Sequence, residues 1–135
     1  MLVHELPVYV DTFQLVKAIY ELGPKYPQAY RYTLGEPLCK AAIELFVPIQ
    51  LANRAEDSRE RIKYLERFFL SYETVKVRLK LSYELKCFNS KQYAILVELM
   101  ENIGKQVNGW LKSSKVKSQV SARIINATAM VREQS

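Results

Sequence analysis

The amino-acid sequence predicts an all-α protein whose helices form an antiparallel up-down four-helix bundle. Three observations support this fold class. A chain of 135 residues fits a single domain. Its 4 glycines and 5 prolines leave long uninterrupted segments, and within these segments apolar residues recur every three or four positions. Hydrophobic residues make up 49% of the chain, enough to bury a core.

The first helix is predicted over residues 8–22. Pro7 precedes it and suits a first-turn position, where a missing N–H group costs nothing. The predicted apolar stripe consists of Tyr9, Phe13, Val16 and Tyr20. Gly23 and Pro24 end the helix, and residues 25–32 are predicted to form a connection.

A second helix is predicted over residues 33–53. Thr33 and Glu36 have the spacing of a capping box. Pro48 is expected to kink the helix or to disturb one turn. The predicted inward stripe is Leu38, Ala41, Leu45, Pro48 and Ala52, and the other side is also apolar, with Ile43, Phe46, Val47 and Leu51. Such a helix needs cover on two sides, so it is either central in the fold or packed against another subunit.

The third and fourth helices are predicted over residues 57–87 and 89–113, with capping residues at Asp57 and at Asn89–Ser90. Residues 75–81 alternate like a strand, but the flanking helical period favours a helix. The predicted inward positions are Ile62, Leu65, Phe69, Tyr72, Leu79 and Tyr83, followed by Leu96, Met100, Ile103, Val107, Trp110 and Leu111.

Gly104 and Gly109 interrupt the fourth helix. Each either permits a close approach of helices or is a tolerated defect that costs about 1 kcal/mol relative to alanine. We assign residues 1–113 to the bundle. We assign residues 114–135 to a basic C-terminal tail, which is either disordered or forms a short helix over 124–131.

The residues that catalysis requires are scarce in this sequence. His4 is the only histidine, and it lies beside the N-terminus, a poor position for a general base. Cys39 and Cys87 form no metal-binding pair and are expected to be free core thiols. Glu98 and Glu101 resemble a solvated helix face, and no glycine-rich phosphate loop is present. We therefore expect no enzyme activity, catalytic residue, metal or cofactor.

Other features of the sequence bear on location. The N-terminal residues lack the basic and apolar regions of a signal peptide. No stretch reaches the length of about 18 apolar residues that a membrane span needs. We therefore expect a cytoplasmic protein that does not associate with membranes.

The net charge of +6 is concentrated in the second half of the chain. Residues 1–75 contain 9 Lys and Arg against 10 Asp and Glu, whereas residues 76–135 contain 11 against 4. Clustered cations displace counterions from a phosphate backbone, which indicates a polyanionic partner. The alternative is a solvated basic surface that only keeps the protein soluble.

Several basic residues after Val75 are candidates for nucleic-acid contacts. Lys76 and Lys80 are four residues apart, so on a helix they project from one face about 6 Å apart, whereas Arg78 projects to another side. The candidate binding residues are Lys76, Arg78, Lys80, Lys86, Lys105, Lys112, Lys115 and Lys117. Tyr83, Phe88 and Tyr93 offer rings for base stacking, although helical spacing favours core positions for them.

Short segments distributed over residues 5–113 resemble the accessory variability determinant (Avd) proteins of diversity-generating retroelements. These segments are residues 6–9 (LPVY), 30–36 (YRYTLGE), 52–54 (ANR), 90–93 (SKQY), 103–106 (IGKQ) and 109–113 (GWLKS), together with the basic pair Lys76 and Lys80. The family usually has arginine at these two positions. Lysine retains the charge but lacks the bidentate fork of arginine.

The resemblance implies a four-helix bundle that assembles into a pentameric ring with a basic surface. It also implies binding of RNA and DNA and association with the retroelement's reverse transcriptase in mutagenic cDNA synthesis, without catalysis. Two alternatives remain open. One is the related four-helix-bundle family encoded by intervening sequences of bacterial 23S ribosomal RNA genes, and the other is a structural protein-interaction oligomer that binds no nucleic acid.

Overall fold

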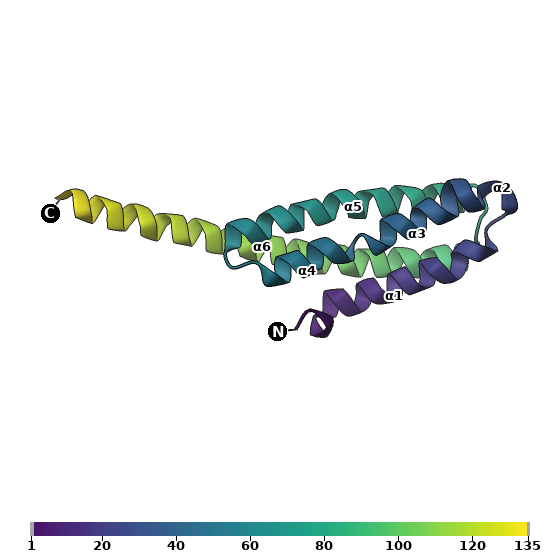
Figure 1. Cartoon of the computed structure of the whole chain (residues 1–135), viewed down its shortest axis with the longest axis horizontal. Helices are drawn as coiled ribbons and strands as arrows, with labels where there is room; N and C mark the ends of the chain where they lie inside the picture. Colours follow the sequence, from purple (N-terminus) through teal and green to yellow (C-terminus); the bar gives the residue numbers. More distant parts are fainter. Residues whose placement is uncertain (1, 135) are drawn as a thin grey trace.

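The computed structural model describes residues 2–134, which form an all-helical bundle without strands (Figure 1). A short 3-10 helix, Val3–Glu5, precedes the bundle. The remaining elements are α1 (Pro7–Leu22), a 3-10 helix (Gly23–Lys25), α2 (Gln28–Tyr30), a π-helix (Arg31–Gly35), α3 (Glu36–Ile43), α4 (Phe46–Arg54), α5 (Ser58–Glu84) and α6 (Ser90–Gln134). Helix α5 packs against α3, α4 and α6, and α1 packs against α3, α4 and α6.

Helix α1 is confirmed, but its predicted apolar stripe is wrong. The buried residues are Val8, Thr12, Leu15, Val16 and Ile19. Of the predicted stripe only Val16 is buried, and Phe13 and Tyr20 are 53% and 47% exposed. Tyr9 and Phe13 lie on the flank of the helix that faces α4, where the Phe46 ring centroid is 5.1 Å from that of Tyr9 and 6.3 Å from that of Phe13. Tyrosine has an apolar ring and a polar tip, so it suits such a boundary better than the core.

Residues 23–35 form short helical pieces rather than the predicted connection and capping box. Thr33 lies inside the π-helix Arg31–Gly35, and its hydroxyl donates to the Ala29 carbonyl at 3.5 Å instead of capping α3. Gly35 is needed because a Cβ there would lie 3.2 Å from the Tyr26 ring, which is 2% exposed. The segment is therefore closed around a buried tyrosine.

The predicted disturbance by Pro48 is confirmed. The second helix is interrupted at Glu44 and Leu45, between α3 and α4. A proline ring clashes with the carbonyl of the residue four positions earlier, which here is Glu44. The predicted inward stripe is buried along its whole length, whereas Ile43 and Val47 on the other side are 44% and 43% exposed.

The long helix α5 is confirmed through the segment with strand-like alternation, and it ends at Glu84 rather than at Cys87. The Asp57 side chain caps its start by accepting a hydrogen bond from the Glu60 backbone N–H at 2.8 Å. Phe68 and Val75, both 0% exposed, were not among the predicted inward residues. Arg61 ties α5 to α4, because its guanidinium donates to the Ala52 carbonyl at 3.0 Å.

Helix α6 starts with a reciprocal cap in which the Asn89 and Gln92 side chains each accept the other's backbone N–H at 2.9 Å. Gly104 permits a close approach, since a Cβ there would lie 2.7 Å from the Tyr72 hydroxyl oxygen. Gly109 has no neighbour within 4 Å, so close packing does not require it.

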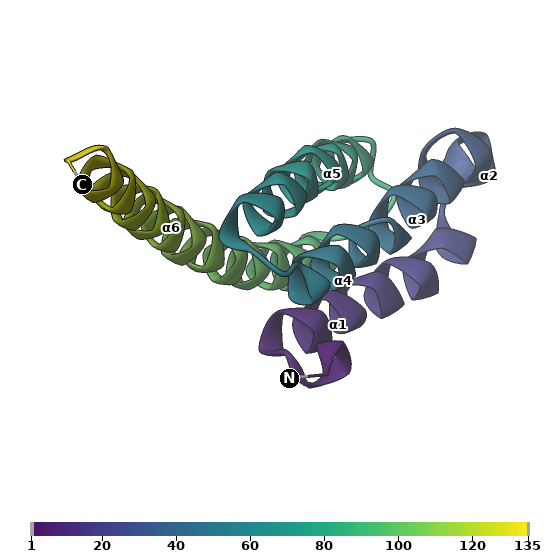
Figure 2. The same ribbon diagram turned by 60° about the vertical axis from the view of Figure 1, so that its left-hand side comes forward.

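The C-terminal segment continues α6 as a helix to Gln134. Ser114, 1% exposed, is the last buried residue among residues 2–132, whose burial the structure describes. Beyond it, α6 extends away from the other helices in both views (Figures 1 and 2). The tail was expected either to be disordered or to form a short helix over residues 124–131. Its described residues form a helix, and this helix extends beyond that range at both ends. The division into a bundle and a separate basic tail stays a prediction.

Candidate nucleic-acid interface

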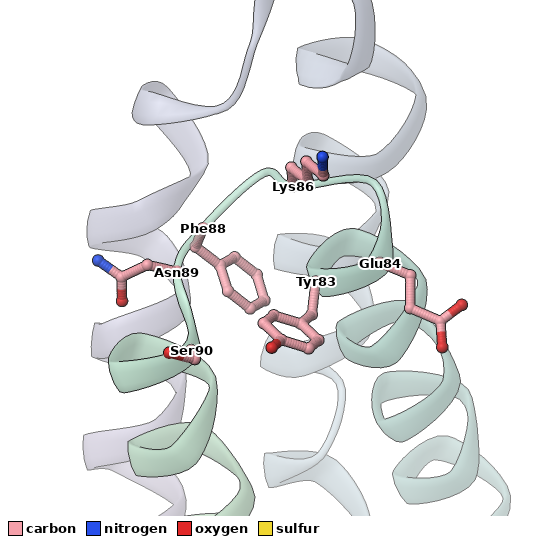
Figure 3. A pocket seen from close by; sticks show the side chains of 6 residues that line it. All are labelled: Tyr83, Glu84, Lys86, Phe88, Asn89 and Ser90. Atoms are coloured by element: carbon pink, nitrogen blue, oxygen red, sulfur yellow. The ribbon is translucent and has the colours of Figure 1, made fainter.

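Lys86 lies in the turn between α5 and α6, at one end of the bundle (Figure 3). Its backbone has a φ of 62°, in the left-handed region that favours glycine. The Cys87 N–H donates to the Ser82 carbonyl and the Lys86 N–H to the Tyr83 carbonyl, both at 2.9 Å, which is the Schellman pattern of a helix C-terminus. The exposed lysine side chain therefore stands at the tip of a closed turn.

A hollow of about 600 Å³ lies beside this turn, lined by Tyr83, Glu84, Lys86, Phe88, Asn89 and Ser90. In Figure 3 the Tyr83 and Phe88 rings face each other below the turn. Tyr83 also stacks on Tyr93, with ring centroids 4.4 Å apart, and Phe88 is 7% exposed. These three rings thus pack against the core, as their helical spacing favours, and the polar side chains at the rim, Glu84 among them, are exposed.

Lys76, Lys80 and Lys105 lie along the seam between α5 and α6. Lys76 lines a cavity of about 140 Å³ and Lys105 lines a neighbouring hollow of about 510 Å³. Tyr72 and Glu101 line both. Lys80 follows Lys76 by one helical turn and is exposed like it. The Glu101 carboxylate offsets part of the positive charge of this seam.

The other candidate residues lie elsewhere. Arg78 is half-buried and, by helical geometry, lies about 160° around α5 from Lys76. Lys112 is exposed on the same outer side of α6 as Lys105, since seven residues are nearly two full turns. Lys115 and Lys117 are exposed where α6 leaves the bundle. The structure therefore brings Lys76, Lys80 and Lys105 to one seam but does not unite all eight residues in one patch.

Sequence reasoning missed a pocket of about 470 Å³ between the end of α1 and the start of α3. Its lining residues are Tyr20, Gly23, Pro24, Arg31, Tyr32, Gly35, Glu36, Cys39 and Lys40. The sequence signal for it lay in residues 30–36, which were interpreted as a capping box and as part of the family resemblance. The pocket was not predicted because residues 31–35 form a π-helix rather than the expected capping box.

Burial raises the pKa of two tyrosines and two cysteines. The pKa of Tyr26 rises to about 12 because burial disfavours its phenolate, and the nearby Ser82 hydroxyl offsets part of this effect. Burial likewise raises the pKa of Tyr72 and of the Cys39 and Cys87 thiols. Both cysteines are free, as expected, and neither thiol is activated as a nucleophile by a lowered pKa.

Two further properties concern metals and membranes. Among residues 2–134, no three histidine, cysteine or acidic side chains gather in a way that would hold a metal ion. Within the same residues, no helix combines the length and the apolarity needed to cross a bilayer.

The structure defines a small helical-bundle protein whose last helix is extended and whose exposed lysines line one seam and one end. The chain belongs to the bAvd-like family, whose model matches residues 9–114. The resemblance inferred from the short segments is thereby confirmed. No match is found among curated proteins. The matched region ends at Ser114, beyond which no residue up to position 132 is buried, so the projecting part of α6 lies outside it.

Proposed function

We propose that this protein is a non-catalytic accessory factor of a diversity-generating retroelement. In this role it binds RNA and also DNA. It associates with the reverse transcriptase and its template RNA during mutagenic cDNA synthesis in the cytoplasm. The observation that carries the proposal is the bAvd-like family match over residues 9–114. This match favours the retroelement family over the ribosomal intervening-sequence family.

The lysines of the α5–α6 seam are the proposed centre of phosphate binding. Lys76 and Lys105 are exposed and border two neighbouring hollows, and the exposed Lys80 follows Lys76 by one helical turn. Lysine acts as a point charge toward phosphate and does not distinguish bases, so binding here is independent of nucleic-acid sequence. The remaining proposed phosphate contacts are Arg78, Lys86, Lys112, Lys115 and Lys117.

A pentameric ring of antiparallel up-down bundles is the proposed assembly. Two separate apolar faces of the described chain remain exposed. One face comprises Val10, Phe13, Ile43 and Val47 of α1, α3 and α4, and the other comprises Leu70, Val77 and Leu81 of α5. Head-to-tail contacts between two different faces generate a ring when the rotation between subunits closes, whereas a two-fold dimer uses one face twice. Two unpartnered faces therefore support a cyclic oligomer.

A salt titration of RNA binding tests the proposed function. The double variant Lys76→Glu/Lys80→Glu should bind RNA more weakly than the native protein. Its log–log salt slope should be lower by about two, because each phosphate-contacting charge contributes about one. The matched control is Arg59→Glu/Lys63→Glu, which makes the same charge change at the same spacing on α5, nearer its other end.

The control should lose less affinity than the seam variant and keep its salt slope. Light scattering and circular dichroism should show that both variants retain their assembly and helicity. Equal losses in the two variants would show that only net charge matters. Absence of RNA binding by the native protein at low salt would contradict the nucleic-acid role as a whole.

A further inference from the structure

The pocket between α1 and α3 is separate from the lysines of the α5–α6 seam, and two glycines form part of its lining. Its floor contains two buried glycines, Gly23 and Gly35. A Cβ on Gly23 would lie 3.2 Å from the Cys39 sulfur, and one on Gly35 would lie 3.2 Å from the Tyr26 ring. Glycine at both positions permits close packing of the pocket lining against these neighbours.

Two tyrosines form the walls of this pocket. Tyr20 is 47% exposed and Tyr32 is 72% exposed, and Pro24 lies between the segments that carry them. Tyr32 belongs to the π-helix Arg31–Gly35, a rare, widened form of helix that is frequently found at functional sites. The exposed aromatic surface is therefore held beside an apolar hollow rather than scattered over the molecule.

Positive charge surrounds the same pocket. The Arg31 guanidinium makes one long hydrogen bond, 3.5 Å to the Tyr26 carbonyl, which leaves most of its N–H groups available. Lys40 is 3.7 Å from the Glu36 carboxylate and so offsets the only acidic group in the lining. Lys25, in the adjacent 3-10 helix, is exposed as well.

The pocket also lies at the end of the bundle that carries Lys86. The Tyr26 ring packs on Gly35 at the pocket floor and on Phe88 beside the Lys86 turn, with Tyr26 and Phe88 centroids 6.1 Å apart. Figure 1 shows α2 and the α5–α6 connection together at this end. A strand of nucleic acid at Lys86 therefore has the pocket within its path.

We propose that this pocket binds an unpaired base of single-stranded nucleic acid, with the Tyr32 ring stacking on the base and Arg31 contacting an adjoining phosphate. The proposal rests on the nucleic-acid role described above and adds a site specific for single strands. Aromatic faces stack on any base, and a base always has a phosphate next to it. An apolar peptide side chain would fill the hollow but leave the surrounding cations without a counterpart.

Binding of the full-length protein to a short single-stranded RNA and to an RNA duplex of the same length tests this site. Tyr32→Ala should weaken binding of the single strand about tenfold, since stacking of one base contributes a factor of this order. It should leave duplex binding unchanged, because a duplex offers no unpaired base. Tyr32→Phe retains the ring and should bind like the native protein. Tyr32→Phe is therefore the matched control for Tyr32→Ala.

Thiol labelling gives a second readout that does not depend on RNA affinity. Cys39 lines the pocket and Cys87 does not. Burial raises the pKa of both thiols, so alkylation is followed at mildly alkaline pH. Adenosine monophosphate at millimolar concentration should slow the labelling of Cys39 and leave that of Cys87 unchanged. Tyr32→Ala should abolish this protection.

The outcomes separate the pocket from the proposed function. Unchanged single-strand binding by Tyr32→Ala, an equal loss on the duplex, or no protection of Cys39 would overturn the pocket and indicate a protein segment as its occupant. Each of these results is compatible with phosphate binding at the seam. Failure of the Lys76→Glu/Lys80→Glu experiment, in contrast, would remove the seam while Cys39 protection by the mononucleotide remained measurable.

Discussion

At the scale of single residues, hydrophobic spacing did not show which residues of α1 are buried or where the turn after α5 forms. The spacing of Tyr9, Phe13 and Tyr20 suggested a core stripe, but these amphipathic rings lie at its edge and the smaller Leu15 and Ile19 fill the core. Lys86 is another example, since its left-handed backbone sits where glycine is usual. Nothing in the local composition marks this turn, because the Schellman pattern depends on how the α5 carbonyls are placed.

The two glycines of α6 give a prediction at this scale. Gly104→Ala places a Cβ against the Tyr72 hydroxyl, which donates to the Met100 carbonyl at 2.8 Å. Relieving the clash requires that this buried hydrogen bond be strained or lost, so the variant should be destabilised by about 1 kcal/mol or more. Gly109→Ala adds its methyl group in open space and should be stabilised by about 1 kcal/mol through helix propensity.

Urea unfolding followed by circular dichroism at 222 nm measures both changes, and each variant serves as the other's control. If the two substitutions shifted stability in the same direction, the close approach of α5 and α6 at Gly104 would be contradicted.

At the scale of elements, long periodic helices with caps were predictable and short ones were not. Helix α5 was identified because Asp57 caps it and because its period extends past the strand-like residues 75–81. The pieces between residues 23 and 35 are too short to show a period, and they are held by the burial of Tyr26 rather than by helix propensity. The same limit hid the pocket, because tertiary packing forms it from short elements.

The projecting part of α6 gives the prediction at this scale. Among residues 115–132, whose burial the structure describes, none is buried, and Val116, Val120 and Ile124 are 59%, 48% and 61% exposed. Truncation after Ser114 should leave the midpoint of thermal unfolding within about 2 °C of the native value, because little buried apolar area is lost. Differential scanning calorimetry of the two proteins under identical conditions makes the comparison. A large fall in the midpoint would show that the projecting helix is covered in the assembled protein.

At the scale of the whole molecule, the chain exposes more apolar surface than its own core can use. Leu70 and Val77 on the outer side of α5 are 74% and 63% exposed. Their spacing of seven residues places them on one line along the helix. The sequence predicted that one helix needed cover on two sides, and that reasoning located the exposed Ile43 and Val47. It did not reveal the α5 face, because the alternation of residues 75–81 was interpreted only as a choice between strand and helix.

The α5 face gives the prediction at this scale. Val77→Glu places a carboxylate on an exposed apolar face, which an isolated monomer would tolerate and a subunit interface would not. We expect light scattering to show dissociation of the assembly, with helicity retained. Val116→Glu, a similar change on the projecting helix outside the family-matched region, is the control. An assembly that survives Val77→Glu would exclude this face from the ring.

Helix α6 is one element of 45 residues, so the part beyond Ser114 carries its far end about 30 Å from the bundle. Ions in the cell damp electrostatic forces over about 8 Å. A molecule bound near Val131 would therefore have no significant electrostatic interaction with the charges around Lys76, although the packed helices connect the two sites. Binding or release of nucleic acid at the seam could affect such a molecule only by changing the orientation of the projecting part of α6.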